Sequence, residues 1–200
     1  MKNKKKTLLM SLAAVLLVAA GVFGTLAYLT STTETVENTF TVGNVNIDLD
    51  EAAVDVYGNK LEGDARRTAN EYKLIPGYKY VKDPKVTVKS GSDKSYVYVK
   101  VVNTLGELET AEADETIAEQ LAKNKWKLVE GNLNVYRHTE THEGEKVLPV
   151  FDTFKLKEGP ADGFEENAPE PITIKAFAIQ ADDITQDDAD AEALKVLLNP

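Results

Sequence analysis

The chain has 200 residues, of which 33 are acidic and 23 are basic, so its net charge is −10 at pH 7. Such an acidic chain lacks the cationic face that phosphate groups require, which argues against nucleic acid and anionic lipid surfaces as partners. The sequence contains no cysteine, which excludes thiol catalysis, cysteine-ligated zinc and iron–sulfur centres.

Residues 1–27 predict a secretory signal peptide. Four lysines lie within the first six residues, and no charged residue occurs from Leu8 to Leu29. A retained transmembrane anchor has a similar length, but small residues near the end favour cleavage between Ala27 and Tyr28. Cleavage leaves 19 basic and 33 acidic residues, a net charge of −14 that suits a soluble secreted protein. Only an uncleaved leader is then expected to contact a membrane.

A polar segment, residues 28–39, follows the leader, and strand patterns begin at Phe40. Apolar residues occupy even positions up to Val42 and odd positions from Val45 onward. Because side chains alternate between the two faces of a strand, this change predicts either a β-bulge or a tight turn near Gly43.

The next strands are predicted at residues 86–88 and 96–102, on either side of the loop Ser90–Asp93. Their alternation predicts a hairpin, and the second strand has apolar or aromatic residues on both faces, so both faces should be covered. Later strands are predicted at Trp126–Val129, Leu133–Tyr136, Val147–Leu156 and Ile172–Gln180. The sequence "HTETHEGEK" between the second and third of these predicts another hairpin loop.

Two short helices complete the prediction. One is expected within Thr110–Asn124, and the other at the C-terminus, where Leu194, Leu197 and Leu198 have helical spacing. Lys157–Pro171 is rich in glycine, proline and acidic residues and predicts a long exposed loop. Seven to nine short strands with turn signals predict an all-β fold, an antiparallel β-sandwich with one or two short helices, forming a single domain over residues 40–200.

The sequence shows no motif that indicates catalysis. His138 and His142 are four residues apart, but Thr139 stands where a zinc protease has glutamate, and histidines in a loop are usually solvated. The acidic tail from Asp182 lacks the glycine that an EF-hand has at its sixth position. We therefore predict no catalytic, cofactor-binding or metal-binding residues, no cofactor and no enzymatic activity.

Several motifs carry a resemblance to a known family. The leader ends in Gly24-Thr25-x-Ala27, a Thr/Ser-rich stretch follows, and then comes Asn38-x-Phe40-x-x-Gly43-x-Val45-x-Ile47. Further matches are "LIPGYKYVKDPKVTVKSGS", "SYVYVKV" and "ITIKAFAIQAD", whereas residues 106–145 match little. The chain resembles the TasA/camelysin (CalY)-like secreted proteins that the SipW-type signal peptidase of Gram-positive bacteria processes.

The resemblance implies a jelly-roll-like sandwich that polymerises in a biofilm matrix. In that family, the N-terminal strand freed by signal cleavage fills a groove of the next subunit, so residues 28–39 would be the donor segment. Its candidate residues are Thr30, Thr32, Thr33, Thr35 and Val36. The competing interpretation is a flexible linker or an edge strand of its own domain. Camelysin has been classed as a metalloprotease, an activity not expected here because the His-Glu-x-x-His pattern is absent.

Two functions follow as expectations. The first is a secreted structural protein, located in the extracellular matrix or at the cell surface, that self-associates into fibres and has other matrix proteins as further partners. The alternative is a monomeric secreted or surface-retained β-sandwich module that binds a glycan or a protein.

Overall fold

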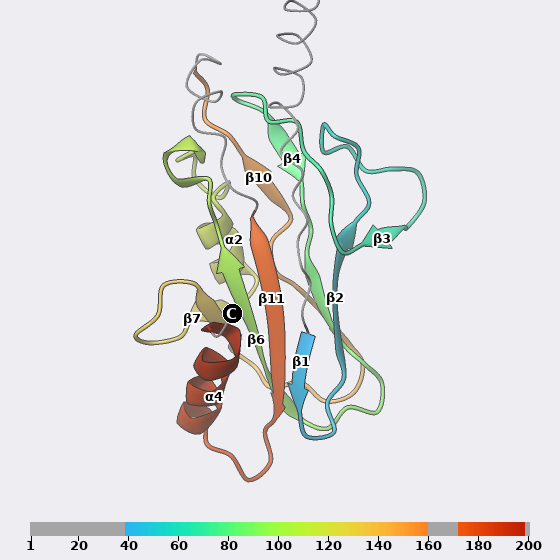
Figure 1. Cartoon of the computed structure of the whole chain (residues 1–200), viewed down its shortest axis with the longest axis vertical. Coiled ribbons are helices and arrows are strands. Elements are labelled where there is room, and N and C mark those ends of the chain that lie inside the picture. Colours follow the sequence, from blue (N-terminus) through green and yellow to red (C-terminus); the bar gives the residue numbers. More distant parts are fainter. Residues whose placement is uncertain (1–38, 160–171, 199–200) are drawn as a thin grey trace, which may run out of the picture.

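The computed structural model of the chain describes residues 39–159 and 172–198. The predicted leader and most of the predicted loop Lys157–Pro171 therefore lie outside the described residues. The described part consists mostly of strands in antiparallel sheets, together with two α-helices, which confirms the predicted all-β class (Figure 1).

The larger of the two main sheets has five strands in the order β1–β11–β6–β8–β7. Its strands are β1 (Thr39–Val42), β6 (Ser95–Val102), β7 (Trp126–Leu128), β8 (Val135–His138) and β11 (Thr173–Gln180). Neighbouring strands run antiparallel except for β1, which pairs with β11 in parallel. The first described strand is therefore an edge strand beside the last one.

The second main sheet has four antiparallel strands in the order β3–β2–β5–β9. Its strands are β2 (Ile47–Ala52), β3 (Arg66–Arg67), β5 (Lys85–Val88) and β9 (Lys146–Pro149). A two-stranded sheet joins β4 (Lys79–Val81) to β10 (Thr153–Lys155). The helical elements are η1 (Gly106–Leu108), α2 (Ile117–Lys123) and α4 (Gln186–Leu198).

One hydrophobic cluster collects buried side chains from both main sheets. Val86 of β5 and Val97 and Val99 of β6 belong to it, and none of the three is exposed to solvent. Alternation along each strand directs every second side chain into this cluster. The burial of these β-branched residues is the main source of stability in a chain without disulfides.

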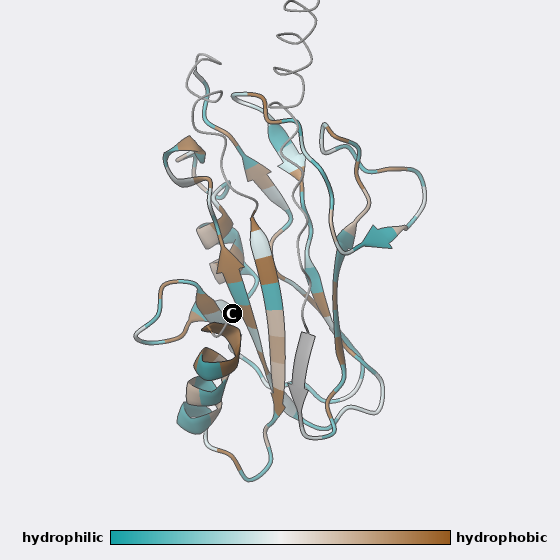
Figure 2. Ribbon diagram, viewed as in Figure 1, coloured by the Kyte–Doolittle hydropathy of each residue, from teal (hydrophilic) through white to brown (hydrophobic). Residues whose placement is uncertain are grey.

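Helix α4 covers the opposite face of the five-stranded sheet. Leu197 of α4 is fully buried in a second cluster together with Tyr98 of β6 and Phe177 of β11. Figure 2 shows the consequence along β11, where alternating bands give way to a continuously hydrophobic stretch. The prediction that residues 96–102 are covered on both faces is confirmed, as is the C-terminal helix.

Helix α2 is shorter than the predicted range 110–124, and its start has a specific cause. Thr116 and Glu119 form a reciprocal capping box, in which the Thr116 hydroxyl accepts a hydrogen bond from the Glu119 N–H at 3.2 Å. This arrangement satisfies N–H groups that have no partner inside the helix, so the helix begins at Ile117.

Both predicted hairpins are wrong. Strand β5 pairs with β2 and β9, whereas β6 pairs with β11 and β8, so the loop Ser90–Asp93 crosses from one sheet to the other. The connection between β8 and β9 crosses between the same two sheets. Alternation reports which side chains are buried, but it does not identify the strand that supplies the hydrogen bonds.

Of the two alternatives predicted at Gly43, the structure agrees with a turn and not with a β-bulge, because β1 and β2 belong to different sheets and the chain bends between them. Another prediction about strands needs correction. The predicted strand Val147–Leu156 is two strands, β9 and β10. Val150 and Phe151 between them are both fully buried, which successive residues of a strand with one buried face cannot be.

Candidate functional site

The edge strand β1 is the first candidate site, because it directly follows the predicted donor segment. It pairs with β11 in parallel register from Thr39–Ala176 to Val42–Ile179. Among the described strands, none pairs with the outer edge of β1. An edge strand presents unpaired N–H and C=O groups, which can accept another strand.

Directly after β1, Gly43 lies close to the side chain of Gln180. Gly43 has φ +88°, and a Cβ added there would lie 2.5 Å from Gln180 Oε1 at the end of β11. Glycine adopts this left-handed conformation without steric cost and leaves room for the glutamine. The chain can therefore turn sharply from the edge of one sheet into the other.

The residues predicted for processing and donation lie upstream of β1. They are Ala27, Tyr28, Thr30, Thr32, Thr33, Thr35 and Val36. All of them lie outside the described residues, so the cleavage site and the donor segment remain predictions.

The two histidines form the second candidate site, and the prediction that they are solvated is wrong. His138 and His142 are 5% and 6% exposed, and His142 Nε2 lies 2.9 Å from His138 Nδ1. The Trp126 and His138 rings pack perpendicular to each other, with ring centroids 5.2 Å apart. The segment between β8 and β9 folds back against the sheet, which brings the two rings together.

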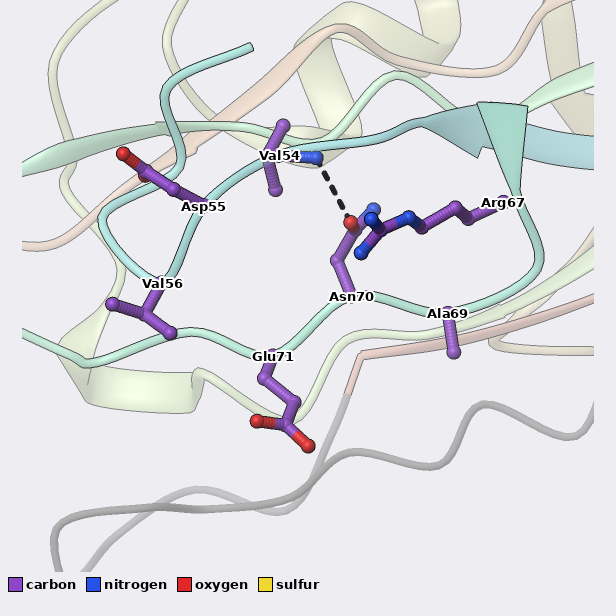
Figure 3. Close-up of a pocket in the computed structure, with 7 residues that line it drawn as sticks. All are labelled: Val54, Asp55, Val56, Arg67, Ala69, Asn70 and Glu71. Carbon is purple, nitrogen blue, oxygen red and sulfur yellow. Dashed lines mark hydrogen bonds between the residues drawn. The ribbon is translucent and has the colours of Figure 1, made fainter. Parts of the chain in front are cut away.

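A hollow of about 570 Å³ is the third candidate site (Figure 3). Its lining residues are Val54, Asp55, Val56, Arg67, Ala69, Asn70 and Glu71. The Asn70 side chain accepts a hydrogen bond from the Val54 N–H at 3.0 Å, and Glu71 points away from it. Asp55 accepts bonds from the N–H groups of Tyr57 and Asn59, so it stabilises a turn. The hollow therefore has polar walls but no nucleophile beside a base.

A buried ion pair lies beside this hollow. Glu51 and Lys82 have side chains that are each 4% exposed, and Lys82 Nζ lies 2.6 Å from Glu51 Oε2. Asn70 Nδ2 donates to the other Glu51 oxygen at 2.9 Å. Each charge thus has a partner, which indicates a structural role. The sequence contained a signal that was missed, because Glu51 follows Ile47 and Leu49 on the buried face of β2.

The neighbouring Asp83 connects several segments. Its carboxylate accepts the Ala52 N–H at 2.6 Å and lies within 3.6 Å of nitrogens of Lys60, Arg66 and Lys85. Burial opposes its ionised form, but the Ala52 hydrogen bond and the three cations outweigh burial and hold the pKa of Asp83 below its usual value. The carboxylate is therefore ionised at neutral pH.

Several wider tests bear on the class of protein. Within residues 39–159 and 172–198, no three His, Asp or Glu side chains are grouped so that they could hold a metal ion. In the same residues, no helix has the length and apolar character needed to cross a bilayer. Comparisons with protein-family models, curated proteins and solved structures gave no match. The described part is thus an all-β unit with an open strand edge at its N-terminal end.

Proposed function

We propose that this chain is a secreted structural protein that assembles into extracellular fibres or biofilm matrix after its leader is removed. The observation that carries the proposal is the position of β1, a four-residue edge strand that continues directly from the predicted donor segment. The shared core of the two main sheets also supports a jelly-roll-like β-sandwich as the finer architecture. The similarity of the leader and strand motifs to the TasA/camelysin-like family points in the same direction.

The proposed mechanism is strand addition between subunits. Residues 28–38 of one molecule would add to a strand edge of the next, where backbone hydrogen bonds supply the affinity without requiring an apolar sequence. Such a contact joins two different surfaces, so it does not close into a ring unless the rotation permits it, and it produces filaments. The uncleaved leader would prevent assembly before export.

A substitution in the donor segment tests this proposal. Proline removes an N–H donor and restricts φ, so Thr33→Pro should leave a folded monomer, whereas the matched Thr33→Ser variant should still form fibres. Circular dichroism reports folding, and light scattering with negative-stain microscopy reports assembly. Equal fibre formation by both variants would contradict strand donation.

The second candidate function is a monomeric module that binds a glycan or a protein. It is favoured by the hollow beside Val56 and Tyr57, because Tyr57 is 42% exposed and exposed aromatic rings commonly contact ligands. Absence of fibres from the unmodified secreted protein under all conditions tested would favour this function over assembly.

A further inference from the structure

The histidine pair closes one end of the five-stranded sheet. His138 is the last residue of β8, and His142 forms an isolated antiparallel bridge with Ser95, the first residue of β6. The Ser95 N–H donates to the His142 carbonyl at 2.8 Å, and the His142 N–H donates to the Ser95 carbonyl at 2.9 Å. His142 is therefore held both by the contact of its ring with His138 and by its backbone bridge to Ser95.

The contacts of the pair fit one arrangement of protons in which both rings are neutral. His138 Nδ1 lies 3.3 Å from the Glu140 nitrogen and 3.4 Å from the Glu140 carbonyl oxygen. In the neutral tautomer without a proton on Nδ1, this nitrogen accepts from the Glu140 N–H. The second contact to the same nitrogen, at 2.9 Å, then requires His142 Nε2 to carry a proton and donate. A proton added to His138 Nδ1 removes the acceptor of both bonds.

The surroundings compensate a positive charge on either ring only in part. The charged groups that face the pair are Glu140 on the same segment, Lys125 before β7 and Lys146 on β9. Glu140 is exposed and lies 2.7 Å from Lys125 Nζ, so its charge is already paired. The two lysines repel an imidazolium, and the Trp126 ring, perpendicular to His138 at a centroid distance of 5.2 Å, keeps water from this side of the ring.

Burial and the two lysines together outweigh the opposing effect of Glu140 on both rings. Burial is the largest cause that lowers the pKa of His138 and that of His142, and it leaves the pKa of His142 at about 4. A histidine whose folded pKa lies below its unfolded value of about 6.5 stabilises the fold above that unfolded value. This stability is lost progressively as the pH falls from about 6.5 towards the folded pKa.

We propose that the His138–His142 contact is an acid-sensitive latch that holds residues 139–145 against the start of β6 at neutral pH and releases them on acidification. The released segment connects the two main sheets. Its further attachments include backbone bonds from Thr139 to Lys125 and from Gly144 to Ser92, and the ion pair between Glu140 and Lys125. Ser95 also pairs with Gln180 of β11, and Gln180 lies against Gly43, the residue directly after β1. The latch is therefore at the end of the sheet where the chain leaves β1. The proposal does not depend on fibre formation.

The chain offers direct probes of this latch, because it contains two histidines and one tryptophan. An NMR titration of the imidazole signals in the secreted protein should give pKa values below 6.5 for both rings. Trp126 fluorescence should change reversibly between pH 6.5 and 4, because an imidazolium in contact with indole quenches it. A pKa at or above 6.5 for either ring would overturn the proposal, and this measurement needs no variant.

Amide exchange tests whether the segment is released. After correction for the intrinsic pH dependence of exchange, protection of the His142 and Gly144 amides should fall at least tenfold between pH 7 and pH 5. Protection of Val99, in the middle of β6, should fall much less. Equal loss at both places would indicate global unfolding, and unchanged protection at His142 would show that the segment stays closed. Either result contradicts the latch.

A paired substitution and a metal control complete the test. The His138→Gln/His142→Gln variant should lose the fluorescence transition, whereas Lys127→Gln, on the exposed side of β7, should keep it. A transition that persists in the double variant would assign it to other groups. A rise in melting temperature on adding zinc chloride to the unmodified protein at pH 7.5, absent in the double variant, would identify a metal site and overturn the latch.

Discussion

Two clusters of buried polar side chains in this molecule avoid an uncompensated buried charge in different ways. The ionic cluster, Glu51, Asn70, Lys82 and Asp83, contains charges that are all paired and hydrogen-bonded. The histidine cluster, Trp126, His138 and His142, is held by ring contacts and by one bond between imidazole nitrogens, and it contains no ion pair. Members of both clusters are at most 6% exposed. Burial therefore selects compensated charge in one region and neutrality in the other.

This difference predicts which region responds first to acid. The pKa of Asp83 is held below its usual value, so the ionic cluster retains the Asp83 contribution until the pH falls below about 4. The pKa of each histidine is lowered by burial, so its contribution begins to decline near pH 6.5. Mild acid should weaken the histidine cluster while leaving the Asp83 interactions intact.

The largest expected effect is the loss of one partner in the ionic cluster. Lys82→Met leaves the Glu51 carboxylate buried without its cation and should lower the free energy of unfolding by about 3–5 kcal/mol. Urea unfolding at pH 7, followed by circular dichroism, measures this change.

Two variants sharpen the interpretation of that loss. Glu51→Gln/Lys82→Met removes both charges and should recover much of the stability, because no unpaired charge remains. Lys89→Met breaks the exposed pair with Asp48 and should cost less than about 1 kcal/mol. If Lys82→Met lowered the free energy of unfolding as little as Lys89→Met does, the stability of the ionic cluster would not depend on pairing of the Glu51 charge.

A smaller effect is expected from acid on the histidine cluster. Lowering the pH from 7 to 5 should reduce the free energy of unfolding by about 1–2 kcal/mol, because the unfolded chain binds protons that the buried rings exclude. Parallel urea titrations at the two pH values measure it. The Glu51→Gln/Lys82→Met variant should show the same pH dependence as the unmodified protein, whereas the His138→Gln/His142→Gln variant should show a smaller one. A pH dependence that is lost in the first variant and kept in the second would assign it to the ionic cluster and contradict this prediction.

The smallest effect should come from a site that touches neither cluster. Thr116→Ala removes the capping box at the start of α2 and should cost about 1 kcal/mol. The loss should be the same at pH 7 and pH 5.5, because the pKa of Glu119 lies below its usual value. Thermal unfolding at the two pH values checks this, and a loss that grows at pH 5.5 would link α2 to the histidine cluster.

Several elements could be predicted because their signals are local. The alternation in residues 96–102 indicated a strand covered on both faces, and the leucines of the C-terminal tail indicated α4. The Thr116-x-x-Glu119 spacing would also have placed the start of α2, although the prediction did not use it. Such signals involve residues within one or two helical turns or within a single strand, so they can be recognised without the tertiary structure.

The candidate sites were less predictable. His138 and His142 occupy a polar, glycine-containing sequence that is typical of an exposed loop, yet both are buried. Their burial depends on Trp126 and Ser95, which come from other parts of the chain. No pattern within "HTETHEGEK" contains that information.

The all-β class, the alternation in most strands and the residues apolar enough to form the core follow from local sequence patterns, because backbone geometry converts these patterns directly into buried faces. Three features depend on long-range packing: β5 and β6 belong to different sheets, β1 pairs with β11, and Glu51 meets Lys82. The physical reason is that hydrogen-bonding edges are chemically alike in every strand. The choice of partner therefore depends on how all the buried faces pack together, which no local segment encodes.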